Sequence, residues 1–528
     1  MIKLGVLADT IMQKLFRDSP KNPSNRRDVK NILANFGGQI TAILSSLIFL
    51  PIIISIVGVE AYGLIAFYTM LLLASSVLDL GLTPALSREI SKSFQSSEDL
   101  IFIKKYIHSA ELVLFLAALA SSVGSVLAAD WVASSWLNLE SLSIDEVATC
   151  IMVVGLVIGL RIFESAYRGV LIGFHEQLTL NVILSFAAVF RWAGSAAVLY
   201  FYDSSVLVFF VWQAGASVLV FVALVFYIYF PIRHVKSDTF WSKAAFRSLW
   251  VFSGPMSIQA LFILLFTQAD KLILSKILTL EDFGYYAIAA IFSSALKQLL
   301  APISQTYFVI FSQNTSTKDI DKLRASFHLS TQFTIALIAP FAFFLCVFSS
   351  EILTLWSSQS ELAIQVAPIL TLLVAGTFLN ILTNPLYNLG LAYGKVGIFL
   401  KINSFAILFF IPGLLFITPI YGAEGAALVW ISLSIYYIAV IPAAIFRIFP
   451  GFDKKKWLKD DILPPVFGSI AVVSFCWFVM PDFESRLLHA AYLTLGLSCT
   501  LCVSFLIAKK LRLIIFSFVR SLFLRNNP

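Results

Sequence analysis

The sequence contains few charged residues, few cysteines and few histidines. Asp, Glu, Lys and Arg make up only 13% of its 528 residues, about half of their share in soluble domains. Of the five cysteines, only Cys499 and Cys502 are close together. Their C-x-x-C lies in an apolar run, which favours buried small residues over a redox or metal site. The sequence also lacks a Walker loop, an H-x-x-x-H metal motif and a G-x-S-x-G turn. These absences argue against ATPase and hydrolase chemistry and predict no metal and no cofactor.

Long apolar runs recur along the whole chain. Hydrophobic residues make up 59% of the sequence, and a membrane-spanning helix needs about 20 mostly apolar residues. Fourteen such runs are found, at 32–57, 63–84, 106–129, 147–171, 179–201, 206–230, 250–277, 284–310, 328–349, 365–389, 398–418, 425–447, 462–480 and 488–508. They lack the alternation of β-barrel strands. The sequence therefore predicts an all-α polytopic membrane protein with about 14 transmembrane helices.

The distribution of Lys and Arg predicts the orientation. With the N-terminus in the cytoplasm, 30 of the 37 basic residues fall in cytoplasmic tails and loops, and the opposite side holds only Arg486. Cytoplasmic loops are enriched in Lys and Arg, so we expect both termini in the cytoplasm. Basic amphipathic patterns in the tails 1–31 and 509–528 predict contact with membrane lipids. The net charge of +7 is therefore interpreted as a topology signal, with no nucleic acid as partner.

The two halves of the chain share a pattern. The stretch "VGVEAYGLIAFY" (57–68) matches "ILTLEDFGYYAI" (277–288), with Glu60 over Glu281 and Gly63 over Gly284, both 221 residues apart. We expect two homologous six-helix lobes around a central cavity, because repeats with an even number of spans insert in the same sense and place the substrate at their interface. The predicted lobes are 32–230 and 250–447, joined by a cytoplasmic linker at 231–249 and followed by two helices within 448–508.

Charged residues lie inside one predicted span. Helical spacing puts Arg161, Glu164 and Arg168 within about 60° of one another. A charge at the bilayer centre costs about 2.5–3.5 kcal/mol on insertion scales, so such residues normally face a protein interior or water. The stripe is either substrate-facing or a structural set of ion pairs. Because Glu164 can neutralise only one arginine, the substrate-facing role is favoured, and Arg191 and Lys297, also near mid-span, would complete a positive site.

Other spans carry polar residues of less certain role. Asn380 and Asn384 share one face of the run 365–389, although such residues also form hydrogen bonds between helices. Asp79 and Asp270 are candidates for binding a coupling proton or sodium ion, or are partners of a nearby Lys or Arg. His328, at a cytoplasmic helix start, is expected to be solvated.

Three stretches together resemble a known family. The sequences "VGVEAYGLIAFY", "LDLGLTPALSREIS" and "IYGAEGAALVWISLS" are similar to the polysaccharide repeat-unit flippases of the O-antigen, Wzx type, within the multidrug/oligosaccharidyl-lipid/polysaccharide exporter superfamily. The resemblance covers about residues 30–450. Two C-terminal helices beyond the twelve of the shorter members are a departure from it.

The resemblance implies a function and its partners. It implies a bacterial inner-membrane flippase, not an enzyme, that moves undecaprenyl-diphosphate-linked oligosaccharides from the inner to the outer leaflet by alternating access. A polysaccharide polymerase and a chain-length regulator are implied partners. Cationic and aromatic residues line the cavity of family members, a role that Arg161, Arg168, Arg191 and Lys297 would take here, with Arg88 at the inner mouth.

Two other functions stay open at this stage. A membrane polymerase or ligase would need a large extracytoplasmic catalytic surface, whereas the longest predicted outer loop, 130–146, has about 17 residues and no Lys or Arg. A cation-coupled drug exporter of the same superfamily would be expected to prefer an anionic cavity, whereas the mid-span charge here is net basic.

Overall fold

The computed structural model describes residues 24–75, 78–79, 81–93, 99–174, 176–232, 242–449, 451–481, 483, 485–513 and 516. The amphipathic tails predicted over 1–31 and 509–528 lie largely outside these residues, as does the middle of the predicted linker 231–249.

The first part of the chain folds into helices joined by short connections. These are α2 (Ser24–Val57), α3 (Val59–Ala74), α4 (Leu82–Ser93), α5 (Asp99–Trp131), the short π-helix η2 (Val132–Trp136), α6 (Ile144–Gly173), α7 (Gln177–Phe201) and α8 (Val206–Ile232). The start of α6 follows from its local sequence. Ser143 accepts a hydrogen bond from the backbone N–H of Glu146, and Asp145 and Glu146 lie in the first turn, where the helix dipole favours negative charge.

The second part of the chain is also helical. It contains α9 (Lys243–Ile277), α10 (Leu280–Ser316), α11 (Ile320–Val347), α12 (Ser349–Ser357), α13 (Ser360–Leu382), α14 (Asn384–Ala392), α15 (Val396–Ile448), α16 (Lys454–Lys456), the π-helix η3 (Trp457–Ile462), α17 (Leu463–Phe478) and α18 (Arg486–Ile507). Within the described residues, 11 helices are long and apolar enough to cross a membrane. The 53-residue α15 is interrupted at Gly422 (φ 58°, ψ −141°), so it contains both predicted runs 398–418 and 425–447. This protein is therefore an all-helical, multi-pass membrane protein.

The predicted span 63–84 is not one continuous helix, which corrects the sequence analysis, whereas the predicted span 365–389 lies inside one candidate membrane span, Ser360–Ala392, that contains a short break. The run 63–84 is divided into α3 and α4, because the chain leaves the helix after Ala74 and turns through Gly81, whose φ is +68°. In the run 365–389, α13 ends and α14 begins near Thr383, and Pro385 lies in the first turn of α14, where its missing N–H costs no hydrogen bond. Hydropathy detects apolar length and is insensitive to both breaks.

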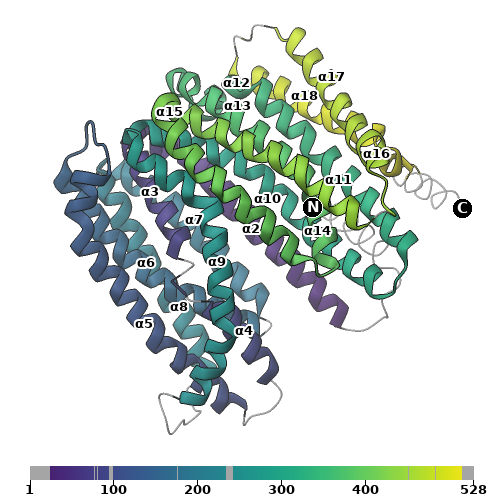
Figure 1. The fold of residues 1–528 in the computed structure, drawn as a ribbon. Coiled ribbons are helices and arrows are strands. Elements are labelled where there is room, and N and C mark those ends of the chain that lie inside the picture. The colour runs from purple at the N-terminus through teal and green to yellow at the C-terminus, as the bar shows by residue number, and fades with distance from the viewer. Residues whose placement is uncertain are drawn as a thin grey trace, which may run out of the picture.

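The helices form two bundles inclined to each other (Figure 1). One contains α3–α8 and the other α10–α15, while α17 and α18 pack against α11. The helix α2 packs along α7 and also reaches α12. The helix α9 contacts α3, α4 and α5 of the first bundle and α10 and α15 of the second. It therefore belongs to both bundles.

At one end the bundles meet through two glycines. A Cβ on Gly63 of α3 would overlap the carbonyl oxygen of Leu280, and one on Gly284 of α10 would lie 2.7 Å from the carbonyl oxygen of Val59. Both pairs, Gly63 with Gly284 and Val59 with Leu280, are separated by 221 positions. The contact is therefore reciprocal, as expected where two repeats meet across a pseudo-two-fold axis.

The loop after η2 joins the bundles at the same end. The carboxylate of Glu60 accepts hydrogen bonds from the backbone N–H groups of Glu140 (2.7 Å) and Ser141 (2.8 Å). On the other side of the loop, the Leu280 N–H donates to the Asn138 carbonyl at 2.9 Å, and the Trp136 indole donates to Ser275 at 3.1 Å. We call residues 58–63, 136–141 and 275–284 the closed junction.

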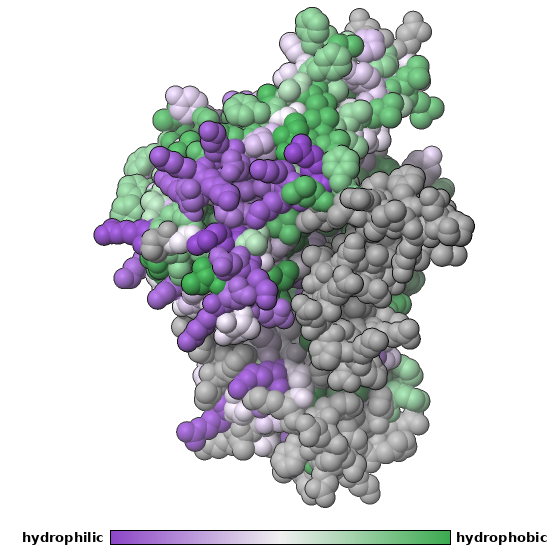
Figure 2. All heavy atoms as spheres, turned by 90° about the vertical axis from the view of Figure 1, so that its right-hand side faces the viewer, coloured by the Kyte–Doolittle hydropathy of each residue, from purple (hydrophilic) through white to green (hydrophobic). Residues whose placement is uncertain are grey.

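The side of the molecule on which α11 begins and α16 lies carries a hydrophilic patch (Figure 2), with apolar surface above it. Exposed basic residues of this region include Lys318, Lys322 and Lys454–Lys456. The patch covers the loops 311–327 and 447–461, and their cytoplasmic position stays a prediction.

Candidate functional site

A single buried carboxylate lies among three arginines. Glu164, on α6, is only 1% exposed. It accepts hydrogen bonds from Arg161 at 3.3 Å, from Arg191 on α7 at 2.9 Å, and from Arg168. We call these four residues the basic cluster. The predicted stripe of Arg161, Glu164 and Arg168 is thus brought together, and Arg191 joins it from a neighbouring helix.

The three arginines differ in exposure. The Arg191 side chain is 7% exposed, that of Arg161 21% and that of Arg168 36%. Glu164 accepts hydrogen bonds from all three arginines, because a carboxylate has two oxygens and about four acceptor positions. One negative charge still balances only one of three positive charges. The Nε atoms of all three arginines are buried and lack a hydrogen-bond partner among the described residues.

Neighbouring helices hold the basic cluster in position. Ser195 donates to the backbone carbonyl of Arg191 at 2.6 Å, and Gln213 of α8 donates to Ser195 at 3.2 Å. Tyr68, buried on α3, lies within electrostatic range of Arg161 and Arg191. Helices α3, α6, α7 and α8 therefore all contribute to one cationic site within the first bundle.

Lys297 is part of a separate group in the second bundle. Its ammonium group lies 4.3 Å from the ring centroid of Trp430 on α15, in a cation–π arrangement. The Trp430 indole donates to Thr377 at 3.1 Å, and Thr377 also shares a 2.7 Å hydrogen bond with Ser293. The predicted joining of Lys297 to the basic cluster is absent from the contacts of the described residues. Lys297 is an exposed residue, so the contact with Trp430 does not enclose it completely.

The asparagines mark the break between α13 and α14. Asn384 accepts a hydrogen bond from Asn388 at 3.1 Å, and Asn388 also donates to the Ser304 hydroxyl at 2.8 Å. The backbone carbonyl of Asn380 accepts from Thr383 at the helix end. Both predicted residues thus lie where α13 ends and α14 begins.

The two aspartates have different surroundings. The carboxylate of Asp79 accepts from the Gly81 N–H (2.6 Å) and from the hydroxyls of Thr83 (2.7 Å) and Ser165 (3.1 Å), so it caps the turn before α4. Asp270 accepts a 2.7 Å hydrogen bond from Tyr286 through one oxygen only. Its other oxygen is buried without a partner among the described residues. Of these two aspartates, Asp270 is therefore the one that keeps a buried carboxylate oxygen without a partner in the described part of the chain.

Arg88 lies on α4, outside the basic cluster. Its guanidinium forms a 2.7 Å ion pair with Glu89, and its side chain is 45% exposed. The role of Arg88 at the inner mouth of a cavity stays a prediction. In the part of the chain that the structure describes, no group of three or more His, Cys, Asp or Glu residues could hold a metal ion.

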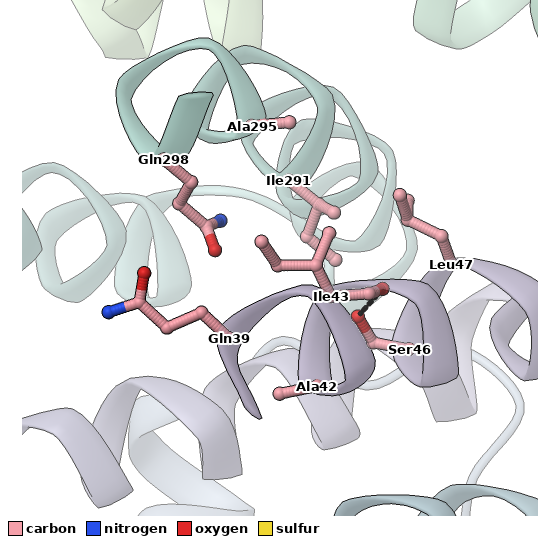
Figure 3. A pocket seen from close by; sticks show the side chains of 8 residues that line it. All are labelled: Gln39, Ala42, Ile43, Ser46, Leu47, Ile291, Ala295 and Gln298. Carbon is pink, nitrogen blue, oxygen red and sulfur yellow. Dashed lines mark hydrogen bonds between the residues drawn. The ribbon is translucent and has the colours of Figure 1, made fainter. Parts of the chain in front are cut away.

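A pocket of about 250 Å³ lies between α2 and α10. Figure 3 shows the amides of Gln39 on α2 and Gln298 on α10 pointing toward each other across it. The remaining lining is Ala42, Ile43, Ser46, Leu47, Ile291 and Ala295. The pocket is therefore shared by the two halves of the chain.

A family model described as "Polysaccharide biosynthesis protein" matches residues 29–315, more than half of the chain. The chain belongs to this family. The matched region runs from α2 to the end of α10 and contains the whole basic cluster. A relative in Shigella flexneri named "Putative O-antigen transporter" is 21% identical over 406 residues, which cover 76% of this chain and 94% of that protein.

Comparison with solved structures identifies the fold of this chain. It is similar to a structure titled "Lipid II flippase MurJ, inward closed conformation", with a TM-score of 0.70 and 14% identity over 92% of this chain and 99% of that one. It is also similar to an inward-facing multidrug resistance MATE family transporter of the MOP superfamily, with a TM-score of 0.60 and 11% identity over 79% and 99% of the two chains. These similarities establish the fold.

Sequence reasoning missed several residues that line or support these groups. Trp430 lies in the quoted stretch "IYGAEGAALVWISLS", and a conspicuous aromatic in a resembling motif was the available signal. Gln298 directly follows Lys297, but an uncharged amide in an apolar run gives little signal. Tyr68 and Gln39 reach the site only through helix packing, which no local pattern encodes.

Proposed function

We propose that this protein is a flippase that moves an undecaprenyl-diphosphate-linked oligosaccharide from the inner to the outer leaflet. The observation that carries the proposal is the basic cluster, in which Glu164 balances one of three arginines inside membrane-spanning helices. Such excess charge needs water or an anionic partner. A pyrophosphate is well suited, because guanidinium groups bind its oxygens through paired hydrogen bonds.

The arrangement of the bundles supports alternating access. The closed junction seals one end of the contact between the bundles, at Gly63 and Gly284. The predicted orientation puts the closed junction on the outer side of the membrane, so substrate would enter from the cytoplasm, past Arg168 and then Arg161. Opening of the junction would then release the head group toward the outer leaflet.

The relatives support a lipid-linked substrate. One is named an O-antigen transporter and another a lipid II flippase. By the same reasoning we place the protein in the bacterial inner membrane with both termini in the cytoplasm, and propose that it works beside a polysaccharide polymerase and a chain-length regulator. No bond is made or broken, so the protein acts as a transporter and not as an enzyme.

Coupling to a proton or sodium ion is best supported at Asp270. Its unpartnered buried oxygen could accept either cation, whereas the carboxylate of Asp79 is occupied by three donors of the α4 cap.

Export of a cationic drug is the second candidate, because a multidrug transporter shares the fold. The net positive basic cluster disfavours it, since a cation would be repelled from Arg161 and Arg168.

A reconstituted system tests the proposal. Proteoliposomes holding the purified protein should translocate undecaprenyl-diphosphate-linked oligosaccharide faster than protein-free vesicles. The double variant Arg161→Gln, Arg168→Gln should lose this activity, and Arg486→Gln, whose side chain lies outside the basic cluster against Ser358, should keep it. Translocation at the protein-free rate by a well-folded wild type, or full activity of the double variant, would refute the proposal.

A further inference from the structure

The pocket between α2 and α10 has an unusual polar lining. Gln39 and Gln298 are exposed, and neither amide takes part in a hydrogen bond of the described residues. The third polar residue, Ser46, is already used, because its hydroxyl donates to the Ile43 carbonyl at 2.9 Å (Figure 3). The two facing amides are therefore the groups available to a ligand.

The chemistry of the lining selects a class of ligand. An amide offers two N–H donors and one acceptor oxygen, and so matches hydroxyl or acetamido groups, which also donate and accept. None of the eight lining residues is charged, so a phosphate would find no ionic partner here. Ala42, Ile43 and Ile291 supply apolar surface for the C–H face of a ring. A sugar satisfies both requirements.

The size of the pocket limits the ligand. Its volume of about 250 Å³ is slightly below the roughly 300–1,000 Å³ typical of sites for drug-sized molecules. It therefore fits one sugar ring better than a whole repeat unit.

The depth of the pocket relates it to the basic cluster. Gln39 and Gln298 lie about 18 residues from the helix ends at the closed junction, Val57 and Leu280, and Arg161 lies about 17 residues from Ile144 at the same end of α6. At 1.5 Å per residue, all three lie roughly 26 Å along their helices. A head group held by the arginines could thus place a sugar at the level of the two amides.

We propose that Gln39 and Gln298 form a sugar-binding subsite that recognises hydroxyl or acetamido groups of the oligosaccharide, separately from the pyrophosphate. The inference rests on the proposed function. Because the two amides come from α2 and α10, the subsite is complete only while these helices face each other. A bound sugar therefore stabilises this arrangement of the two bundles.

The subsite is tested by comparing the binding of two lipids that differ only in whether they carry the sugar. Binding to the purified full-length protein is measured for undecaprenyl-diphosphate-linked oligosaccharide and for undecaprenyl diphosphate alone. Removing one neutral hydrogen bond weakens binding by roughly two- to tenfold. We expect Gln39→Ala and Gln298→Ala each to weaken binding of the sugar-bearing lipid by this factor, and the double variant by more, while affinity for undecaprenyl diphosphate is unchanged. Gln365→Ala, an exposed position on α13 outside the pocket, is the matched control and should change neither affinity.

The possible outcomes separate the subsite from the proposed function. Unchanged affinity of the double variant for the sugar-bearing lipid would overturn the subsite while leaving the flippase proposal intact. Equal weakening for both lipids would also overturn it, because the amides would then act on the fold or on the pyrophosphate. Failure of the folded wild type to bind either lipid would overturn both proposals.

Discussion

The guanidinium of Arg191 lies 2.9 Å from the carboxylate of Glu164, although the two residues belong to different helices. Arg191 is the most deeply buried of the three arginines around this carboxylate. Its contact with Glu164 therefore joins α7 to α6 and fixes the position of the carboxylate. Arg161 and Arg168 are more exposed, so under the proposed function they are the members of the basic cluster that would contact the substrate.

Replacing the shared carboxylate should damage the fold before it damages transport. Glu164→Gln leaves three guanidinium groups around an uncharged amide, and breaking a buried ion pair costs about 3–5 kcal/mol. We expect lower yield of folded protein and a lower unfolding temperature in detergent. Glu361→Gln, at an exposed position on α13, should match the wild type. An unchanged unfolding temperature for Glu164→Gln would show that the arginines do not depend on this carboxylate.

Arg161 and Arg191 should respond differently to substitution. Arg161→Gln should cut flipping at least tenfold, equivalent to about 1.4 kcal/mol of charge-assisted binding, with near-normal expression, because Glu164 keeps two other partners. Arg161→Lys should restore only part of the activity, since Lys keeps the charge but lacks the paired donors. Arg191→Gln should mainly lower stability. Flipping rates normalised to folded protein distinguish these effects, and equal behaviour of the two Gln variants would contradict the division of roles.

Composition and periodicity predicted the fold class well, because lipid imposes long apolar runs whatever the tertiary contacts. The breaks near Gly81 and Thr383 escaped because hydropathy ignores backbone angles. His328 shows a different limit. It was expected to be solvated, but it is 2% exposed and hydrogen-bonded to Asp461 of η3, which is 1% exposed and also accepts from Gln332 at 2.8 Å. That network forms only when the C-terminal helices pack on α11, and residue 328 alone carries no sign of it.

The basic cluster was partly predictable from the helical period of the sequence. Arg161, Glu164 and Arg168 share one helix, so a helical period was enough to group them. Arg191 joins them through helix packing, and Lys297 lies instead against Trp430. Mid-span position identifies a residue that needs a partner, but it does not say which bundle supplies that partner.

Replacing a glycine of the closed junction by a larger residue should shift the protein toward a form in which the junction is open. In Gly63→Ala the new methyl group would overlap the Leu280 carbonyl, a backbone group that cannot move without shifting α10. Spin labels at the exposed residues Ser134 and Tyr421, with the exposed Cys499 and Cys502 replaced by Ser, should report a longer distance between the bundles. Gly37→Ala is the matched control, because its Cβ would meet no atom within 4 Å. An unchanged distance between the spin labels in Gly63→Ala would show that the contact between Gly63 and Leu280 does not hold the junction closed.

The closed junction should also respond to pH through Glu140. Lost hydration raises the pKa of Glu140, and the nearby carboxylates of Glu281 and Glu60 raise it further. A raised pKa means that the closed form binds the proton more tightly. Its stabilisation is therefore complete below the ordinary glutamate pKa of about 4.3 and is lost as pH rises through the raised value. The same spin labels should report more of the closed form at acidic pH in the wild type, and a weaker pH response in Glu140→Gln. An identical pH response in both proteins would assign the effect to another group.

Ion coupling should distinguish the two aspartates. In Asp79→Asn the side-chain oxygen can still accept from the Gly81 N–H, and the hydroxyls of Thr83 and Ser165 can rotate to accept from the new amide. We therefore expect normal folding and a retained response to ion gradients. In Asp270→Asn the side-chain oxygen can still accept the hydrogen bond from Tyr286, but the side chain no longer carries the negative charge that would bind a proton or a sodium ion. Gradient-driven flipping should therefore fall to the rate that is measured without a gradient. The flipping rate of both variants is measured in proteoliposomes with an imposed proton or sodium gradient. A full gradient response in Asp270→Asn would remove this residue from coupling, and loss of the response in a stable Asp79→Asn would show that the α4 cap also binds the ion.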